Sequence, residues 1–147
     1  IGKAQMVREG SDIVIWSAGT MLADAIALAD QLEREDGLSV GIVNARFIKP
    51  LDESMLRETA NSAKLLVTLE DHVIQGGFGS AILEALNVLD LQTPLKRIGW
   101  PDQFVGHASS VNDLRAPLGL DADGIIRQVR QAFSACAAPA DCIGSPL

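Results

Sequence analysis

Val67–Ser80 reads Val-Thr-Leu-Glu-Asp-His-Val-Ile-Gln-Gly-Gly-Phe-Gly-Ser. The apolar residues that lead into it, Leu65–Leu69, are typical of a buried strand. A polar stretch, Glu70–His72, and a glycine-rich turn follow, and after Ser80 apolar residues recur at helical spacing. We therefore expect a strand with a polar tip, then a turn and a helix. Because open α/β sheets meet ligands and partners beyond the carboxyl ends of their strands, the candidate site is sought here.

The rest of the chain alternates between strand and helix patterns in the same way. Further strands are expected at Ala4–Val7, Ile13–Trp16, Leu38–Val43 and Leu95–Ile98, and further helices after Thr20, Asp52, Ser110 and Asp121. This alternation predicts an α/β fold, a three-layer α/β/α sandwich around a mostly parallel sheet. We expect one domain over residues 1–133. Residues 134–147, rich in Ala, Pro and Ser, are expected to form a disordered tail.

Composition excludes several classes of protein. The 147 residues suit one domain, and the net charge of −7 comes without a basic patch, so no nucleic-acid partner is expected. No apolar run reaches the length of a membrane span and no signal peptide is visible, so we expect a cytoplasmic protein that does not contact membranes. The chain begins with Ile1 and not with methionine, and we interpret it as a piece of a longer protein.

Cysteine and histidine usage predicts no metal site. Cys136 and Cys142 lie near the end of the chain, far from the two histidines, His72 and His107. Their spacing matches no common zinc motif. The two cysteines are interpreted as incidental thiols of the tail, with a redox pair as the alternative.

The glycine-rich turn has two interpretations. It opens a helix and so can bind an anion on free backbone amides, although its spacing matches neither the dinucleotide fingerprint nor a P-loop. The favoured interpretation is that its glycines allow close approach to another surface. The residues predicted to lie at an interface or near a site are His72, Gly76, Gly77, Phe78 and Gly79.

Glu70, Asp71 and His72 form the densest group of titratable residues in the sequence. A carboxylate beside a histidine can support acid–base chemistry, but adjacent residues at a strand tip point in different directions. A structural or interface role is therefore favoured for His72. No nucleophile elbow is present, so hydrolase chemistry is not expected and no catalytic residue is predicted.

Arg115 lies on a short helix that Ser110 is expected to cap. Its side chain is expected to project away from the core. Without further information, a surface arginine of this kind is interpreted as a solvated charge.

Three motifs in order resemble the C-terminal domain of the transketolase superfamily of thiamine-diphosphate enzymes. They are Ala45–Asp52, Val67–Ser80 and Trp100–His107. The last of them, together with Leu-Arg-Ala-Pro-Leu-Gly-Leu-Asp at Leu114–Asp121, is similar to the 1-deoxy-D-xylulose-5-phosphate synthase family. The resemblance covers roughly Gly2–Phe133.

The resemblance implies a function that the spacing alone does not. Synthases of this family condense pyruvate with glyceraldehyde 3-phosphate and release CO2, with a product used in isoprenoid, thiamine and pyridoxal biosynthesis. Thiamine diphosphate and Mg²⁺ are held by a Gly-Asp-Gly motif in another domain, and this chain lacks that motif. The chain is thus expected to be the third domain, to bind no cofactor and to be inactive alone.

The resemblance also implies partners and site residues. The expected partners are the other domains of the same polypeptide and, through them, a second subunit of a homodimer. Arg115 falls on a family arginine that holds an anionic group of the substrate. The family often has asparagine at the position of His72, so His72 is not expected to be essential. The alternatives are another superfamily member, such as transketolase or the pyruvate dehydrogenase β-subunit, or a stand-alone α/β interaction module.

Overall fold

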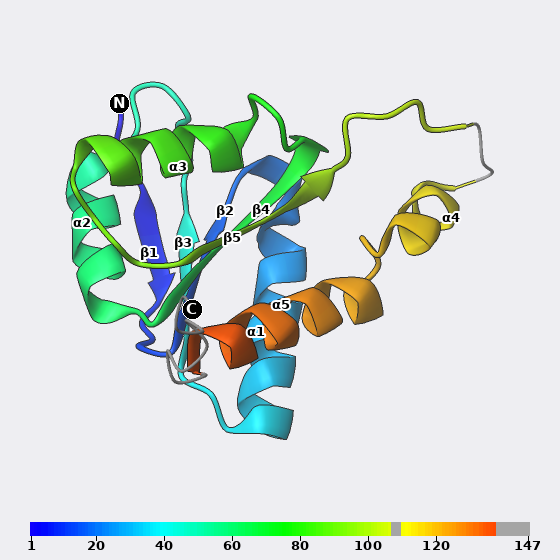
Figure 1. The fold of residues 1–147 in the computed structure, drawn as a ribbon, viewed down its shortest axis with the longest axis horizontal. Helices are drawn as coiled ribbons and strands as arrows, with labels where there is room; N and C mark the ends of the chain where they lie inside the picture. Colours follow the sequence, from blue (N-terminus) through cyan, green and yellow to red (C-terminus); the bar gives the residue numbers. More distant parts are fainter. Residues whose placement is uncertain (107–109, 138–147) are drawn as a thin grey trace, which may run out of the picture.

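A five-stranded sheet forms the middle layer of the molecule (Figure 1). The computed structural model describes residues 1–106 and 110–137. The strands are β1 (Gln5–Arg8), β2 (Ile13–Ser17), β3 (Val40–Asn44), β4 (Leu65–Val73) and β5 (Leu95–Trp100), in the order β1-β3-β2-β4-β5. Strands β2 to β5 pair in parallel, whereas β1 runs antiparallel to β3 at one edge. The predicted mostly parallel sheet is confirmed.

Helices cover both faces of this sheet. In Figure 1, α1 (Leu22–Asp36) and α5 (Ala122–Ala137) lie on one face, and α2 (Glu53–Ser62) and α3 (Phe78–Val88) lie on the other. Each face has its own apolar core, one around Ile15 and Leu32 and the other around Trp16 and Ile82. The three-layer α/β/α sandwich is therefore confirmed. Of the helices in the described part of the chain, none combines the length and apolarity that a bilayer span requires.

Strand β4 is longer than the sequence predicts. Its apolar run stops at Leu69, but the strand continues to Val73, which pairs with Trp100 after a shift in register. Glu70–His72 thus belong to the strand and not to a polar tip beyond it. The polar residues can continue the strand because the carboxylates of Glu70 and Asp71 accept hydrogen bonds from groups within the domain.

Asp52 caps α2, as predicted, and also fixes the start of the chain. Its buried carboxylate accepts from the backbone amide of Met55 at 3.2 Å and from that of Ala4 at 3.0 Å. Burial opposes ionisation of Asp52, but these amides and the Lys3 ammonium outweigh it and lower the pKa of the carboxyl. One side chain thus joins the N-terminal segment to the start of a helix.

The described part of the segment between β5 and α5 extends beyond the sheet edge in Figure 1. It contains α4 (Val111–Arg115) and a 3-10 turn, η2 (Ala116–Leu118), and no residue of either is buried. The Ser110 hydroxyl accepts from the Asp113 amide at 3.2 Å, so the predicted cap is confirmed. His107 lies outside the described residues.

Helix α5 runs further than the sequence predicts. The Asp121 carboxylate accepts from the Gly124 amide at 3.0 Å and caps the helix, as expected. The helix then continues to Ala137, so residues 134–137, including the exposed Cys136, are helical and not part of a disordered tail. The remainder of the expected tail, with Cys142, lies outside the described residues.

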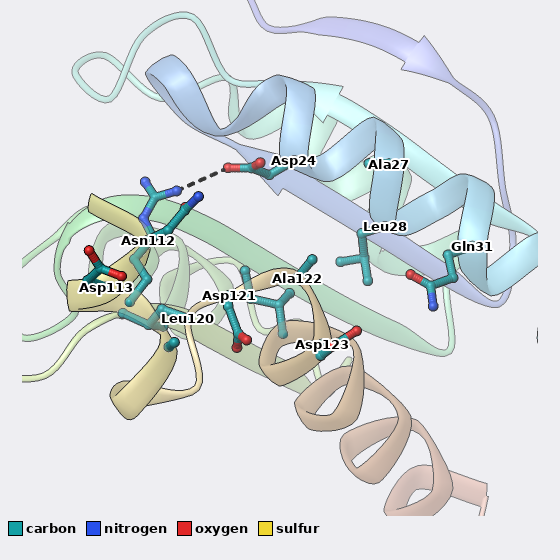
Figure 2. Close-up of a pocket in the computed structure, with 13 residues that line it drawn as sticks. Asp24, Ala27, Leu28, Gln31, Asn112, Asp113, Leu120, Asp121, Ala122 and Asp123 are labelled. Carbon is teal, nitrogen blue, oxygen red and sulfur yellow. Dashed lines mark ion pairs between the residues drawn. The ribbon is translucent and has the colours of Figure 1, made fainter. Parts of the chain in front are cut away.

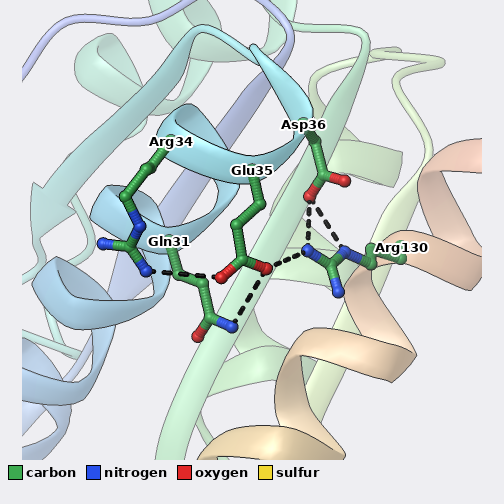
Figure 3. Close-up of polar contacts among 5 residues, drawn as sticks. All are labelled: Gln31, Arg34, Glu35, Asp36 and Arg130. Carbon is green, nitrogen blue, oxygen red and sulfur yellow. Dashed lines mark hydrogen bonds and ion pairs between the residues drawn. The ribbon is translucent and has the colours of Figure 1, made fainter.

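Arg130 joins α5 to the end of α1 by ion pairs. Its guanidinium lies 2.8 Å from a Glu35 oxygen and 2.9 Å from an Asp36 oxygen (Figure 3). These ion pairs are solvent-exposed, and such pairs contribute little to stability. The buried residues Ile126 and Val129 dock α5 on the sheet instead.

Candidate functional site

A groove of about 680 Å³ opens at the carboxyl ends of β2 and β4, the corner where the sequence places the candidate site. Its walls come from the 3-10 turn η1 (Gly19–Met21), the segment after β3, the end of β4 and the first half of α3. Of the residues predicted to lie near the site, four line the groove: His72, Gly76, Gly77 and Phe78. Exposed Ile48 adds an apolar side chain to it.

The first two amides of α3 face a carboxylate of the chain itself. Glu70 is 3% exposed, and its two oxygens accept from the backbone amides of Phe78 at 2.7 Å and Gly79 at 2.8 Å. A helix N-terminus favours negative charge, and Glu70 supplies it. The anion-binding interpretation of the turn is therefore wrong for these amides.

The glycines of the turn are required by contacts within the domain. A Cβ at Gly77 would collide with the Glu70 carboxylate and the Val73 carbonyl oxygen, and one at Gly79 would lie 2.6 Å from the Thr68 hydroxyl. Gly76 has a φ of +70°, a left-handed conformation that favours glycine. The close approach expected of these glycines thus occurs between α3 and β4. Contact with a further surface stays a prediction.

The three titratable neighbours at the end of β4 point to different places. Glu70 serves the N-terminus of α3, whereas Asp71 accepts from the indole nitrogen of Trp100 at 2.7 Å. His72 is exposed, and its Nδ1 lies 3.1 Å from the Val73 carbonyl oxygen. The three side chains thus contact different partners.

Arg115 points inward, which corrects the expectation of a projecting, solvated side chain. Its side chain is 16% exposed, and its guanidinium lies 3.0 Å from an Asp71 oxygen and 3.6 Å from an Asp24 oxygen. A guanidinium nitrogen also lies 3.5 Å from the Met21 sulfur. The physical reason is that α4 has no buried residue of its own, and two carboxylates on the domain attract its one arginine.

The environment of Asp71 favours its charged form. The Trp100 hydrogen bond and the Arg115 guanidinium hold the pKa of Asp71 below its ordinary value, although partial burial opposes this. A polar network therefore connects β5 through β4 to α4 by way of Trp100, Asp71 and Arg115. Local sequence patterns do not reveal this network, because its three members lie far apart in the sequence.

A second cavity, of about 500 Å³, lies beside Arg115 between α1, the α4–η2 segment and α5 (Figure 2). Its floor includes Leu28 and Ile125. Figure 2 shows Asp24 on α1, with a dashed line marking its ion pair to the arginine of α4. Arg115 thus lies at the boundary between this cavity and the end of β4.

Binding of Mg²⁺ and a diphosphate would need grouped ligands and free backbone amides among the described residues. Among them, no three His, Cys, Asp or Glu side chains are grouped as metal ligands. The Phe78 and Gly79 amides, which could bind a phosphate, already donate to Glu70.

Comparison with protein families matches residues 2–125 to the family described as transketolase, C-terminal domain. Among curated proteins, the chain is 45% identical over 131 residues to the 1-deoxy-D-xylulose-5-phosphate synthase of Bacillus licheniformis, covering 88% of this chain and 20% of that protein. It is 42% identical over 129 residues to the synthase of Acidobacterium capsulatum, again covering 88% and 20%. The chain thus spans about one fifth of the length of these relatives.

Solved structures share the fold. A structure described as a split gene transketolase, inactive β4 tetramer, has a TM-score of 0.81 and 32% identity, covering 90% of this chain and 43% of that one. A transketolase from Pichia stipitis in complex with sedoheptulose 7-phosphate has a TM-score of 0.65 and 11% identity, covering 91% and 18%. The second likeness supports the fold alone.

Proposed function

Since the chain belongs to the transketolase C-terminal domain family, we propose that it is the C-terminal domain of a 1-deoxy-D-xylulose-5-phosphate synthase. The observation that carries this proposal is the 40–45% identity to such synthases over most of the chain. The proposed reaction of the whole polypeptide joins pyruvate to glyceraldehyde 3-phosphate, with loss of CO2. The chain matches about one fifth of the length of such a relative, which supports the other domains of the same polypeptide as its partners.

Within that enzyme, this domain is proposed to form one wall of the active site and to take part in dimer assembly in the cytoplasm. Thiamine diphosphate supplies the electron sink for the decarboxylation when it is bound by other domains together with Mg²⁺. Arg115 is the proposed substrate-binding residue of this chain. Its guanidinium presents a planar fork of donors that matches the oxygens of a phosphate or carboxylate.

The test of the activity uses the full-length polypeptide that contains this chain. We expect it to convert pyruvate and glyceraldehyde 3-phosphate into 1-deoxyxylulose 5-phosphate and CO2. Transketolase is the second candidate, favoured by the likeness to a split gene transketolase. Transfer of a two-carbon unit between sugar phosphates, without CO2, would replace the first proposal by the second.

Arg115→Ala in the same enzyme tests the substrate role. Loss of a charge-assisted contact with an anion costs roughly 1.5–3 kcal/mol, so kcat/KM is expected to fall about ten- to a hundred-fold. Because Arg115 also forms ion pairs within the domain, a modest fall in melting temperature is expected as well. Wild-type kinetics in this variant would mean that Arg115 does not bind substrate.

The groove beyond β2 and β4 is the proposed surface for assembly, with His72, Gly76, Gly77 and Phe78 on it. Substituting Gly77 would disturb the contact of α3 with β4 and so would not report on assembly. Ile48→Glu is more informative, because Ile48 is exposed on the groove. We expect it to weaken association, measured by sedimentation, whereas Val88→Glu, an exposed residue at the other end of α3, should not. Equal sedimentation of all three proteins would exclude the groove as an interface.

A further inference from the structure

We propose that Asp71 positions the Arg115 guanidinium for an anionic group of the substrate, and that Asp24 occupies the place of that anion until the substrate binds. The proposal rests on the proposed function, because it assigns an order of events to the arginine of that site. Asp71 and Asp24 contact the same guanidinium, but the proposal assigns them opposite effects on substrate binding.

Asp71 has the properties of a fixed partner. Its carboxylate lies 3.0 Å from a terminal nitrogen of Arg115 and accepts the Trp100 indole hydrogen at 2.7 Å. Asp71 lies near the end of β4 and Trp100 is the last residue of β5, so the hydrogen bond between them ties the carboxylate to the neighbouring strand. A carboxylate held in this way fixes the direction in which the fork of Arg115 points.

Asp24 has the properties of an exchangeable partner. Its side chain is 48% exposed, against 38% for Asp71, and its carboxylate lies 3.6 Å from the other terminal nitrogen of Arg115, beyond ordinary hydrogen-bond distance. Asp24 and Arg115 both line the cavity between α1 and α4. A phosphate or carboxylate of the substrate can therefore bind this nitrogen of Arg115 by displacing the weak, solvated contact with Asp24.

The groups packed around Arg115 support this division of roles. From η1 it meets the Met21 sulfur, from α1 Asp24 and from β4 Asp71. On its own helix, the Asp113 carboxylate accepts from the Ser110 hydroxyl at 2.8 Å. The Asp71 carboxylate has to remain in place for the arginine to keep its orientation, because Asp71 and its partner Trp100 both belong to the sheet. If the Asp24 carboxylate moves away, one terminal nitrogen of Arg115 is left without an acceptor.

The experiment compares four variants of the full-length holoenzyme: Arg115→Ala, Asp71→Asn, Asp24→Asn and Asp123→Asn. Asp123 lines the same cavity without pairing to Arg115, so its variant is a control with the same change in charge. KM is measured separately for pyruvate and glyceraldehyde 3-phosphate, and urea unfolding is recorded for each variant.

For the substrate whose KM rises in Arg115→Ala, Asp71→Asn should raise KM about ten-fold, the loss expected for a charge-assisted contact. Asp24→Asn should lower the same KM by about two- to five-fold, the size of an exposed ion pair. Asp123→Asn should leave it unchanged. A merely structural role cannot produce tighter binding in Asp24→Asn, so this improvement is the decisive result.

Failure of this proposal differs from failure of the proposed function. If the enzyme is active and Arg115→Ala raises KM, but Asp71→Asn and Asp24→Asn change KM in the same direction, the roles assigned here are wrong. An unchanged KM in Asp24→Asn also overturns them. If the polypeptide has no synthase activity, the proposed function itself fails, and if Arg115→Ala behaves as wild type in an active synthase, the proposed substrate role of Arg115 fails.

Discussion

The carboxylate of Glu70 shows how one residue can change the meaning of a motif. A glycine-rich turn before a helix is an anion site when its amides are free. Here the amides of Phe78 and Gly79 donate to Glu70, which the sheet brings beneath the helix. The turn is therefore part of the internal structure of the domain, and its outer surface is what remains for partners.

Glu70→Ala is expected to destabilise the domain by about 2–4 kcal/mol, because it leaves two buried amides without an acceptor. Glu70→Gln retains one acceptor oxygen and should cost about half as much. Urea unfolding of the chain measures both changes. Glu84→Ala is the control, since Glu84 is an exposed glutamate of α3 and should change stability by less than about 0.5 kcal/mol. Equal effects at positions 70 and 84 would contradict this account of Glu70.

Which residues the sequence predicts correctly depends on how local their partners are. Asp52, Ser110 and Asp121 each cap a helix that begins next to them, and all three caps were predicted from the sequence. The inward ion pairs of Arg115 were not, because Asp24 and Asp71 lie far from it in the chain. A local sequence pattern cannot reveal partners that are far apart along the chain.

At the scale of elements, Asp52 joins two of them and gives a pH-dependent prediction. Its pKa is lowered in the folded protein, so its contribution to stability is present above its unfolded value, about 3.9, and is lost as pH falls through the lower folded value. Asp52→Ala should cost about 1–2 kcal/mol at neutral pH, where cap and charge are both lost.

Asp52→Asn separates the two contributions, because asparagine caps a helix about as well as aspartate but carries no charge. We expect its stability at neutral pH to lie between those of wild type and Asp52→Ala. Its acid sensitivity, followed by urea unfolding at pH 2–7, should be smaller than that of the wild type. A wild-type pH dependence in Asp52→Asn would show that another carboxyl group is responsible.

Helix α5 allows apolar packing to be weighed against surface ion pairs. Ile126→Ala removes a buried side chain and should cost about 2–4 kcal/mol. Arg130→Ala removes exposed ion pairs to Glu35 and Asp36, so its smaller effect should vanish at high salt. Urea unfolding at 0.05 M and 1 M NaCl measures both, and a salt-independent loss in Arg130→Ala would contradict this ranking.

The elements themselves were largely predictable because their signals are local. The apolar runs at β2 and β3 and the helical spacing after Ser80 are properties of short stretches of chain. The predicted ends of β4 and α5 are wrong: pairing with β5 extends β4 past its apolar run, and α5 continues through the exposed residues 134–137. The end of β4 is thus set by contact between elements.

At the scale of the whole molecule, the structure presents a folded unit with a groove at one end and a cavity beside Arg115. Both lie near the carboxyl ends of the strands, where open α/β sheets usually contact ligands. The chain spans about one fifth of the length of its curated relatives, and the proposed function assigns the cofactor site to other parts of such a polypeptide. Cofactor binding by the isolated chain therefore tests the proposed division of roles between the domains.

The isolated chain of 147 residues is expected to fold but to bind neither thiamine diphosphate nor Mg²⁺ appreciably. The physical reason is that the phosphate-accepting amides of Phe78 and Gly79 already donate to Glu70, and the described carboxylates are not grouped as metal ligands. Calorimetric titration with the cofactor and Mg²⁺ should give no heat of binding, whereas the full-length polypeptide should bind with micromolar affinity or better. Circular dichroism of the same sample confirms that the isolated chain is folded. Micromolar binding to the isolated chain would place the cofactor site within it and overturn the division of roles between the domains.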